Sequence, residues 1–305
     1  MSDPADQRPS GPTVLAVDVG GTKLAAAVVD GSGGMHARHE SPTEGTDAEA
    51  LFERLCAVVD RALQGSGDEP EVVGVGCGGP MTRGGEAVSP VNIPQWRGFP
   101  LRARLAERYG LPVHVDNDAK ALALAEGWLG AARGRADFLA MVVSTGVGGG
   151  IVCDGRLLDG RVGNAGHIGH VIVDPRGHLC GCGARGCLEA EASGTAIRRI
   201  TGRPAEEATP EVRARTGRLV GRAVASIVNV LDLPLAVVAG SVALGFGDEF
   251  FDAANAELRR RAQLDFSVGA RIDPAGCGAQ GPLLGAAAVA RRAMGIPVLT
   301  AEVTA

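Results

Sequence analysis

The sequence predicts an α/β protein built as two lobes with a cleft between them. A short β-branched strand, a glycine turn and a second strand occur twice, with Gly20 and Gly146 at the two turns, 126 residues apart. Helical patterns alternate with buried strands around both hairpins. The recurrence indicates two halves of related design. Because 46 of the 305 residues are glycine, two glycine hairpins arising by chance is the alternative.

The first lobe is expected over residues 13–118, after a polar, proline-rich tail of residues 1–12. Thr46 and Glu49 have the spacing of a capping box at the start of its first helix. Gly110 is placed to close its second helix. The pattern predicts strands and helices at residues 14–19, 24–29, 46–63, 71–77, 101–109 and 113–115.

The second lobe is expected over residues 119–282, and a final helix at 283–294 returns to the first lobe. Its predicted elements are an alanine-rich helix, a strand on each side of the second glycine turn, a long helix and a further strand: residues 119–129, 138–144, 151–153, 211–231 and 235–239.

Charge and hydropathy exclude several classes of function. With 30 basic and 35 acidic residues the net charge is −5, whereas proteins that bind nucleic-acid backbones usually carry a basic surplus. No apolar run reaches the roughly 18 residues of a membrane span, and the N-terminus lacks the apolar core of a signal peptide. We therefore expect a cytoplasmic protein that binds neither membranes nor nucleic acid.

The two glycine turns are candidate phosphate-binding loops. Turns without β-carbons let backbone N–H groups approach a phosphate closely, and a carboxylate beside them can hold Mg²⁺. The order of residues is not that of a Walker A loop, and a plain hairpin turn is the alternative for each. The candidate residues are Asp18, Gly20, Gly21, Thr22 and Lys23 in the first turn and Thr145 and Gly146 in the second.

Asn117 and Asp118 lie where a predicted strand ends and a helix begins. A carboxylate there is held ionised by the helix dipole and can accept a proton from a sugar hydroxyl as a general base. Asn117 can hydrogen-bond the same substrate. The alternative is that Asp118 is simply the N-cap of the helix.

Four soft metal ligands lie within eighteen residues: His170, Cys180, Cys182 and Cys187. Intervening glycines allow the loop to bend around an ion, and four N and S ligands suit a closed, tetrahedral, structural Zn²⁺ site. A set of buried free thiols is the alternative. Cys56, Cys77, Cys153 and Cys277 lie in apolar or glycine-rich segments and are expected to be small core residues.

Together these motifs resemble the ROK family of repressors, open reading frames and sugar kinases, over about residues 14–292. The resemblance implies an actin-like ATPase (ribonuclease H-like) fold. Val17–Lys23 and Ser144–Gly150 are similar to the family's two phosphate motifs. Gly240 lies in a segment similar to its adenosine motif, although Ala239 replaces the usual first glycine.

The resemblance also implies roles for the remaining residues. Asp118 corresponds to the catalytic base, and His170 both ligates zinc and faces the sugar. The implied sugar contacts are Asn92, Asn117, Asp118, His167, His170 and Glu189. The implied reaction is ATP·Mg²⁺-dependent phosphorylation of the 6-hydroxyl of a hexose, by a chain that forms a homodimer or higher homo-oligomer.

One departure concerns the choice of sugar. The family's glucokinases usually carry Gly-Glu-x-Gly-His, but this chain has His167 at the glutamate position. A bacterial N-acetylmannosamine kinase branch is similar in having Ala-Gly-His-Ile-Gly-His, as at Ala165–His170. A neutral imidazole can donate as well as accept hydrogen bonds, so glucose and N-acetylhexosamines both remain candidates. His167 could instead only pack against the zinc loop.

Three further questions stay open at the level of sequence. The phosphoryl donor is ATP or polyphosphate. A zinc-stabilised sugar-binding or regulatory protein without catalysis is the alternative function. A sugar-responsive repressor is disfavoured, because only about twelve residues precede the first strand and the net charge is negative.

Overall fold

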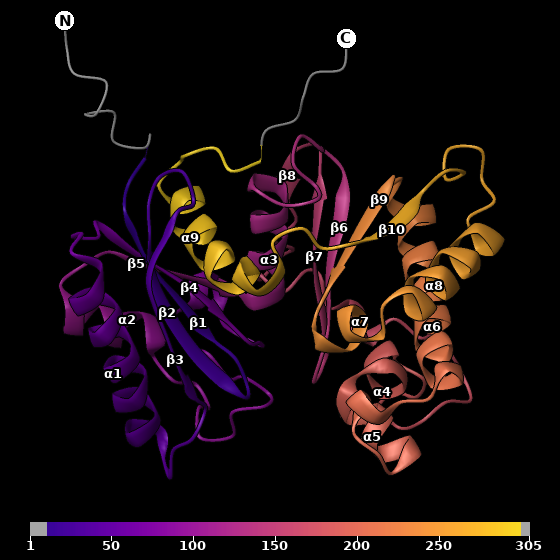
Figure 1. Ribbon diagram of the computed structural model, residues 1–305, viewed down its shortest axis with the longest axis horizontal. Coiled ribbons are helices and arrows are strands. Elements are labelled where there is room, and N and C mark those ends of the chain that lie inside the picture. The colour runs from indigo at the N-terminus through magenta and orange to yellow at the C-terminus, as the bar shows by residue number, and fades with distance from the viewer. Residues whose placement is uncertain (1–10, 300–305) are drawn as a thin grey trace, which may run out of the picture. The chain divides into compact units, whose positions relative to one another are not determined.

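The computed structural model describes residues 11–299, which form two compact units (Figure 1). The first unit holds residues 11–125 together with Asp159–Asn164 and Ala279–Val298. The second unit holds Glu126–Leu158, Ala165–Gly278 and Leu299. Residues 1–10 of the predicted tail lie outside the described residues, and Pro12 is already buried.

The first unit is built on a five-stranded mixed sheet in the order β3-β2-β1-β4-β5. β2 runs antiparallel to β1 and β3, whereas β4 runs parallel to β1 and β5. Its strands are β1 (Val14–Val19), β2 (Lys23–Val29), β3 (Met35–Pro42), β4 (Val72–Cys77) and β5 (Val113–Asn117), and its helices are α1 (Ala48–Ser66), α2 (Leu101–Tyr109), the start of α3 (Asp118–Trp128) and α9 (Gly281–Ala293).

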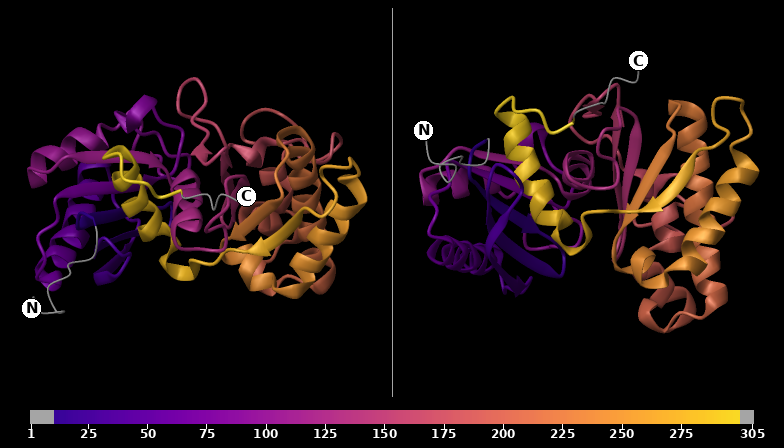
Figure 2. Two further views of the ribbon diagram at one scale, coloured as in Figure 1. Left: turned by 90° about the horizontal axis from the view of Figure 1, so that it is seen from above. Right: turned by 45° about the horizontal axis from the view of Figure 1, so that its top comes forward.

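Helices cover both faces of this sheet, which explains why every residue of β1 is buried. α1 packs on β2 and β3, while α9 lies across β1 and β4 (Figures 1 and 2). The approach of α9 is close at Gly74 of β4, where a β-carbon would lie 2.0 Å from the carbonyl oxygen of Ala286. α9 and β4, which are far apart in the sequence, therefore pack directly against each other.

The start of α1 differs from the predicted capping box. Asp47, not Thr46, is the N-cap, and its carboxylate accepts a hydrogen bond of 2.9 Å from the backbone N–H of Ala50. Glu49 is engaged by Arg104 through two hydrogen bonds of 2.7 Å. Glu49 therefore forms a long-range ion pair with Arg104 and does not complete the capping box that the local pattern predicted.

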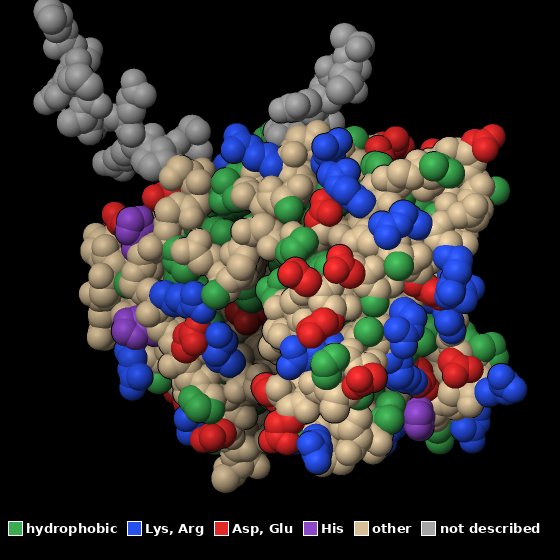
Figure 3. All heavy atoms as spheres, turned by 45° about the vertical axis from the view of Figure 1, so that its right-hand side comes forward, with side chains coloured by type: hydrophobic (Ala, Val, Ile, Leu, Met, Phe, Trp, Pro, Cys, Tyr) green, Lys and Arg blue, Asp and Glu red, His purple; other side chains and the backbone are tan. Residues whose placement is uncertain are grey.

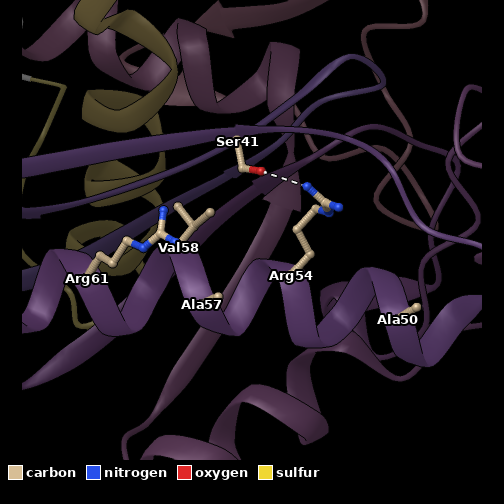
Figure 4. A pocket seen from close by; sticks show the side chains of 6 residues that line it. All are labelled: Ser41, Ala50, Arg54, Ala57, Val58 and Arg61. Carbon is tan, nitrogen blue, oxygen red and sulfur yellow. Dashed lines mark hydrogen bonds between the residues drawn. The ribbon is translucent and has the colours of Figure 1, made fainter.

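A shallow pocket of about 270 Å³ lies between α1 and β3. Arg54 and Arg61 project along it from α1, and Arg54 donates a hydrogen bond of 3.3 Å to the Ser41 hydroxyl (Figure 4). None of the residues singled out by the sequence motifs lines this pocket.

The second unit contains another five-stranded mixed sheet, in the order β10-β9-β6-β7-β8. α6 and α8 pack against each other, and Gly217 and Gly221 of α6 let the backbone of α8 approach closely. Its strands are β6 (Phe138–Val143), β7 (Val147–Cys153), β8 (Arg156–Leu157), β9 (Leu235–Ala239) and β10 (Arg271–Pro274), and its helices are α4 (Leu188–Ala192), α5 (Gly194–Thr201), α6 (Pro210–Leu231), α7 (Ser241–Phe246) and α8 (Asp248–Arg261).

Several helices and strands carry no expectation from the sequence pattern: β3, β8, β10, α4, α5, α7 and α8. β3 reads MHARHESP and is an edge strand of its sheet, with alternate residues exposed and no apolar run. Half of the residues of α8 are charged, and only Phe250, Ala254, Glu257 and Leu258 are buried. Their positions depend on partners far away in the sequence.

Surface properties agree with the near balance of charges in the sequence. On the face drawn in Figure 3, basic and acidic side chains are interspersed. Among residues 11–299, every helix is too short or too polar to traverse a lipid bilayer.

Candidate active site

Asn117 and Asp118 stand at the junction of β5 and α3. The side-chain oxygen of Asn117 accepts hydrogen bonds from the backbone N–H groups of Ala119 (3.1 Å) and Lys120 (3.3 Å). Asn117 therefore caps the helix. One oxygen of Asp118 accepts a 2.8 Å hydrogen bond from the N–H of Ala119, so the carboxylate is oriented at the positive end of the helix dipole.

Asp18, the fifth residue of β1, is a buried carboxyl group of the same unit. Burial raises its pKa to about 7, the Asp118 carboxylate adds to the rise, and Lys23 opposes it. Two glycines of the neighbouring segment lie beside this acidic pair. β-Carbons at Gly76 and Gly78 would lie 3.6 Å from a carboxylate oxygen of Asp18 and 3.9 Å from one of Asp118.

The first glycine turn closes directly after β1. The backbone N–H of Gly20 donates to the carbonyl of Lys23 at 2.9 Å, while Gly21, Thr22 and Lys23 are exposed. The Lys23 ammonium forms a 3.0 Å ion pair with Glu40. Asn92 packs against the turn, since a β-carbon on Gly21 would lie 2.6 Å from the β-carbon of Asn92.

An ion-pair network around a buried lysine supports the start of α3. The Lys120 ammonium, only 2% exposed, contacts Asp116 and Asp159, each at 2.8 Å. Arg292 of α9 also pairs with Asp159, at 2.7 Å. Burial alone would raise the pKa of Asp159, but hydrogen bonds from Arg292 and Lys120 lower it to about 2. The sequence analysis missed this network; its one signal was a lysine in an alanine-rich helix.

The second glycine turn connects β6 and β7. Ser144 donates its backbone N–H to the carbonyl of Gly146 at 2.9 Å. The N-terminus of α5 contacts the turn through two hydrogen bonds. The Gly194 N–H donates to the Ser144 carbonyl at 2.7 Å, and the Thr195 hydroxyl donates to the Thr145 carbonyl at 2.9 Å. The backbone carbonyls of the turn are therefore held on the side that faces α5.

Gly240 stands between β9 and α7 beside this turn. Its φ of 102° favours glycine, and a β-carbon would lie 2.3 Å from the Val143 carbonyl oxygen. The hydroxyl groups of Ser144 and Ser241 are 3.0 Å apart. The second phosphate motif and the segment similar to the adenosine motif thus meet within one unit.

Glu189, the second residue of α4, points its carboxylate at the same turn. One carboxylate oxygen accepts a 3.0 Å hydrogen bond from the backbone N–H of Val147. That oxygen would lie 2.9 Å from a β-carbon on Gly146. Gly169 packs close to both partners, since its β-carbon would lie 2.4 Å from the Val147 carbonyl oxygen and 3.3 Å from the Glu189 β-carbon.

His167 and His170 flank this contact on the segment that includes the short helix η3 (Ile168–His170). Both side chains are exposed, and their rings lie nearly parallel with centroids 6.3 Å apart. Glu189, His167 and His170 are thereby gathered next to the second glycine turn. The structure places Asp18, Asn92, Asn117 and Asp118 in the first unit.

His170, Cys180, Cys182 and Cys187 form one cluster, with their ligand atoms within 4.8 Å of one another. Cys182 and Cys187 sulfurs are 3.7 Å apart, as are the Cys180 sulfur and the Nδ1 atom of His170. Ligands on a tetrahedral Zn²⁺ are about 3.5–3.8 Å apart, given zinc–ligand bonds of about 2.0–2.3 Å. Burial, with Cys182 and Cys180 adding to it, raises the pKa of Cys187 to about 12. The cluster has the geometry and chemistry of a four-ligand zinc motif.

Comparison with known proteins identifies the family. The family model described as "ROK family" matches residues 14–293. The chain is 39% identical over 253 residues to an N-acetylmannosamine kinase of Escherichia fergusonii, covering 77% of this chain and 85% of that protein.

Two solved structures share the fold over nearly their whole lengths. A ROK hexokinase from Thermus thermophilus is 36% identical with a TM-score of 0.82, covering 93% of this chain and 99% of that one. A ROK glucokinase from Streptomyces griseus, solved with glucose and AMPPNP, is 32% identical with a TM-score of 0.81, covering 92% and 99%.

The fold and the motifs therefore define a ROK protein, and the predicted α/β, actin-like architecture is confirmed. This chain belongs to the ROK family, and its resemblance to the family's sugar kinases is confirmed by these relatives.

Proposed function

We propose that this protein is an ATP-dependent sugar kinase that phosphorylates the 6-hydroxyl of a hexose. The observation that carries the proposal is the acidic pair of Asp18 and Asp118. Asp18 is buried in β1 next to a glycine turn, and Asp118 is oriented by the start of a helix capped by Asn117. A plain N-cap does not require a second carboxylate, and a sugar-binding protein without catalysis does not require a general base.

Asp118 is the proposed base. The N–H of Ala119 orients its carboxylate, which would receive the proton of the sugar hydroxyl as the hydroxyl oxygen attacks the γ-phosphorus. Asp18 is not proposed as the base, because its carboxyl is buried and lacks the orientation that the start of α3 gives to Asp118.

The two glycine turns are proposed to bind the phosphates. Backbone N–H groups without neighbouring β-carbons can approach phosphoryl oxygens and stabilise developing negative charge. Asp18 would hold Mg²⁺, which neutralises phosphate charge when bound and would favour the ionised form of this buried carboxyl. Gly240 and its neighbours in the second unit would contact the nucleoside.

The proposed sugar contacts are those that the family resemblance implies. They are Asn92, Asn117, Asp118, His167, His170 and Glu189. The E. fergusonii relative is named for N-acetylmannosamine and the S. griseus structure contains glucose. His167 supports an N-acetylhexosamine, since an imidazole N–H can donate to an acetamido carbonyl where a glutamate could not.

Zn²⁺ is proposed to stabilise the loop that carries the sugar contacts. His170, Cys180, Cys182 and Cys187 would hold it with no open coordination position, so its contribution is folding free energy rather than Lewis-acid chemistry. His170 links the two sites, because its Nδ1 faces the cysteines and its Nε2 remains for a sugar hydroxyl.

The test is a turnover assay with glucose, N-acetylmannosamine, N-acetylglucosamine, mannose and allose, using either ATP or polyphosphate as donor. We expect sugar-dependent ADP formation, with a 6-phosphate product identified by mass spectrometry and NMR. Binding of sugars without any phosphoryl transfer from either donor would favour the non-catalytic alternative. Transfer from polyphosphate alone would correct the donor and leave the base unchanged.

A further inference from the structure

Each glycine turn is packed against a residue proposed to contact the sugar. In the second unit, the space that a β-carbon of Gly146 would need is taken by the carboxylate of Glu189, 2.9 Å away. In the first unit, the space beside Gly21 is taken by the side chain of Asn92, 2.6 Å from the position of a β-carbon. The same relationship is thus present at both proposed phosphate turns.

At the second turn the contact is also a hydrogen bond. The oxygen of Glu189 that faces Gly146 accepts from the N–H of Val147 at 3.0 Å. A hydrogen bond to an ionised carboxylate is stronger than one between neutral groups. Val147 is the first residue of β7, so Glu189 is hydrogen-bonded to the point where the turn meets its strand.

The other side of the turn leaves it little freedom to adjust. Gly194 and Thr195 of α5 hold the carbonyls of Ser144 and Thr145. Glu189 therefore contacts Gly146 and Val147, directly after the two residues that α5 holds. Because close-packed contacts of this kind have few alternative arrangements, small shifts at one partner displace the other.

We infer that Glu189 and Asn92 are positioning residues for the two phosphate turns as well as sugar contacts, so that sugar binding and nucleotide binding are energetically linked. This inference rests on the proposed function. A carboxylate shared between a sugar hydroxyl and the Val147 N–H fixes the turn more firmly when the sugar is present. By linkage, the nucleotide must then tighten sugar binding by the same factor.

The experiment measures binding of the two ligands separately by titration calorimetry, with a non-hydrolysable ATP analogue and Mg²⁺ so that no turnover occurs. The sugar is whichever hexose is the best substrate in the turnover assay. For the unmodified protein we expect each ligand to tighten the other about fivefold or more, a typical size for coupling between sites. A factor of one would overturn the inference.

Substitutions at Glu189 and at Gly146 are each expected to weaken binding of the ligand that the other residue is proposed to contact. Glu189→Ala is expected to weaken binding of the nucleotide analogue severalfold even without sugar, whereas Glu189→Gln, which keeps an acceptor for the Val147 N–H, restores most of that affinity. Gly146→Ala is expected to weaken sugar binding even without nucleotide, because the added methyl group displaces the Glu189 carboxylate. A Glu206→Ala variant, on the exposed surface of the same unit, is the control.

A double-mutant cycle protects the test against simple loss of folding. Removing the carboxylate makes room for the methyl group, so Gly146→Ala combined with Glu189→Ala should bind nucleotide as well as Glu189→Ala alone. Such non-additivity is the expected signature of two groups in contact. Additive effects, in variants whose thermal unfolding is intact, would show that the contact does not link the sites.

Asn92 gives an independent test in the first unit. Asn92→Ala is expected to lower the affinity for the nucleotide analogue in the absence of sugar. Failure of the inference is distinguishable from failure of the proposed function. If the unmodified protein turns over a hexose while its two ligands bind independently, only the linkage is wrong. If it binds neither ligand, the proposed function is wrong as well.

Discussion

The Asp118 carboxylate lies near enough to Asp18 to raise the pKa of this second, buried carboxyl group. Burial is the larger cause, and together the two effects bring the pKa of Asp18 from 3.8 to about 7. Asp18 therefore titrates near neutral pH instead of in the usual range of a carboxyl group. Asp118, oriented by the start of α3, is the member suited to accept a proton, and Asp18 is the member suited to a cation.

The raised pKa of Asp18 makes stability depend on pH. The folded protein holds a proton that the unfolded chain releases between about pH 4 and pH 7, so the contribution of this group to stability falls as pH rises through that window. Asp18→Asn removes the ionisation. We expect its stability relative to the unmodified protein to increase by on the order of 2 kcal/mol between about pH 5 and pH 8.

The measurement is urea unfolding of both proteins at several pH values without added metal. Addition of Mg²⁺ and nucleotide should stabilise the unmodified protein at high pH and leave the Asp18→Asn variant nearly unchanged. A stability difference that does not vary with pH would contradict the raised pKa.

Asp118→Asn should retain the fold and lose turnover. The amide can still accept a hydrogen bond from the N–H of Ala119, but it cannot take a proton, and loss of a general base costs roughly 10²-fold to 10⁴-fold in kcat. Sugar affinity should change much less. Steady-state kinetics and sugar titrations of this variant are to be compared with Asp232→Asn, an exposed C-cap where asparagine also tolerates the positive φ. Near-normal kcat would remove Asp118 from the mechanism.

One zinc ion per chain is expected, bound by His170, Cys180, Cys182 and Cys187. Cys182→Ala should lower the metal content and the melting temperature, because a closed site contributes folding free energy. Elemental analysis of protein purified without chelators gives the stoichiometry. Cys153→Ala, which changes a half-buried thiol outside the cluster, is the matched control and should keep its zinc. Protein free of stoichiometric metal would refute the zinc proposal.

His167→Glu tests the choice of sugar. If His167 contacts the sugar, the substitution restores the glucokinase-like pattern and raises the ratio of kcat/KM for glucose over N-acetylated hexoses. One neutral hydrogen bond is worth roughly 0.5–1.5 kcal/mol, so the ratio should move about threefold to tenfold. An unchanged ratio with a lower melting temperature would mean that His167 only packs against the zinc loop.

Lys120→Met should destabilise the first unit. The ammonium is 2% exposed and bridges Asp116 and Asp159, so its removal leaves two carboxylates short of a partner, although Arg292 still pairs with Asp159. Because Asp159 is partly exposed to solvent, we expect a loss of about 1–3 kcal/mol rather than the larger cost of a fully buried pair. Arg259→Met, at an exposed position of α8, should change stability by less than about 0.5 kcal/mol. Equal unfolding curves for the two variants would contradict a stabilising role for Lys120.

Local sequence patterns predicted many of the elements and the order of the motifs. Strand β9 and helix α2 have the bounds expected from their apolar runs and closing glycine. The four residues of the proposed zinc site were also predictable, because four soft ligands and three glycines lie in one short stretch of the chain, and the structure gathers their ligand atoms within 4.8 Å. These features depend on interactions between residues close in the chain.

Tertiary structure decided the features that join distant segments. Asn117 caps α3 where the sequence left Asp118 as a possible cap, and Glu49 pairs with Arg104 instead of completing a capping box. The packing of Glu189 against Gly146, over forty residues away in the chain, had no local signal. By itself the sequence determined which chemical groups the protein carries and on which turns and helices they lie. Only the folded chain decided their neighbours, because burial, charge pairing and close packing arise when strands and helices from remote parts of the sequence come together.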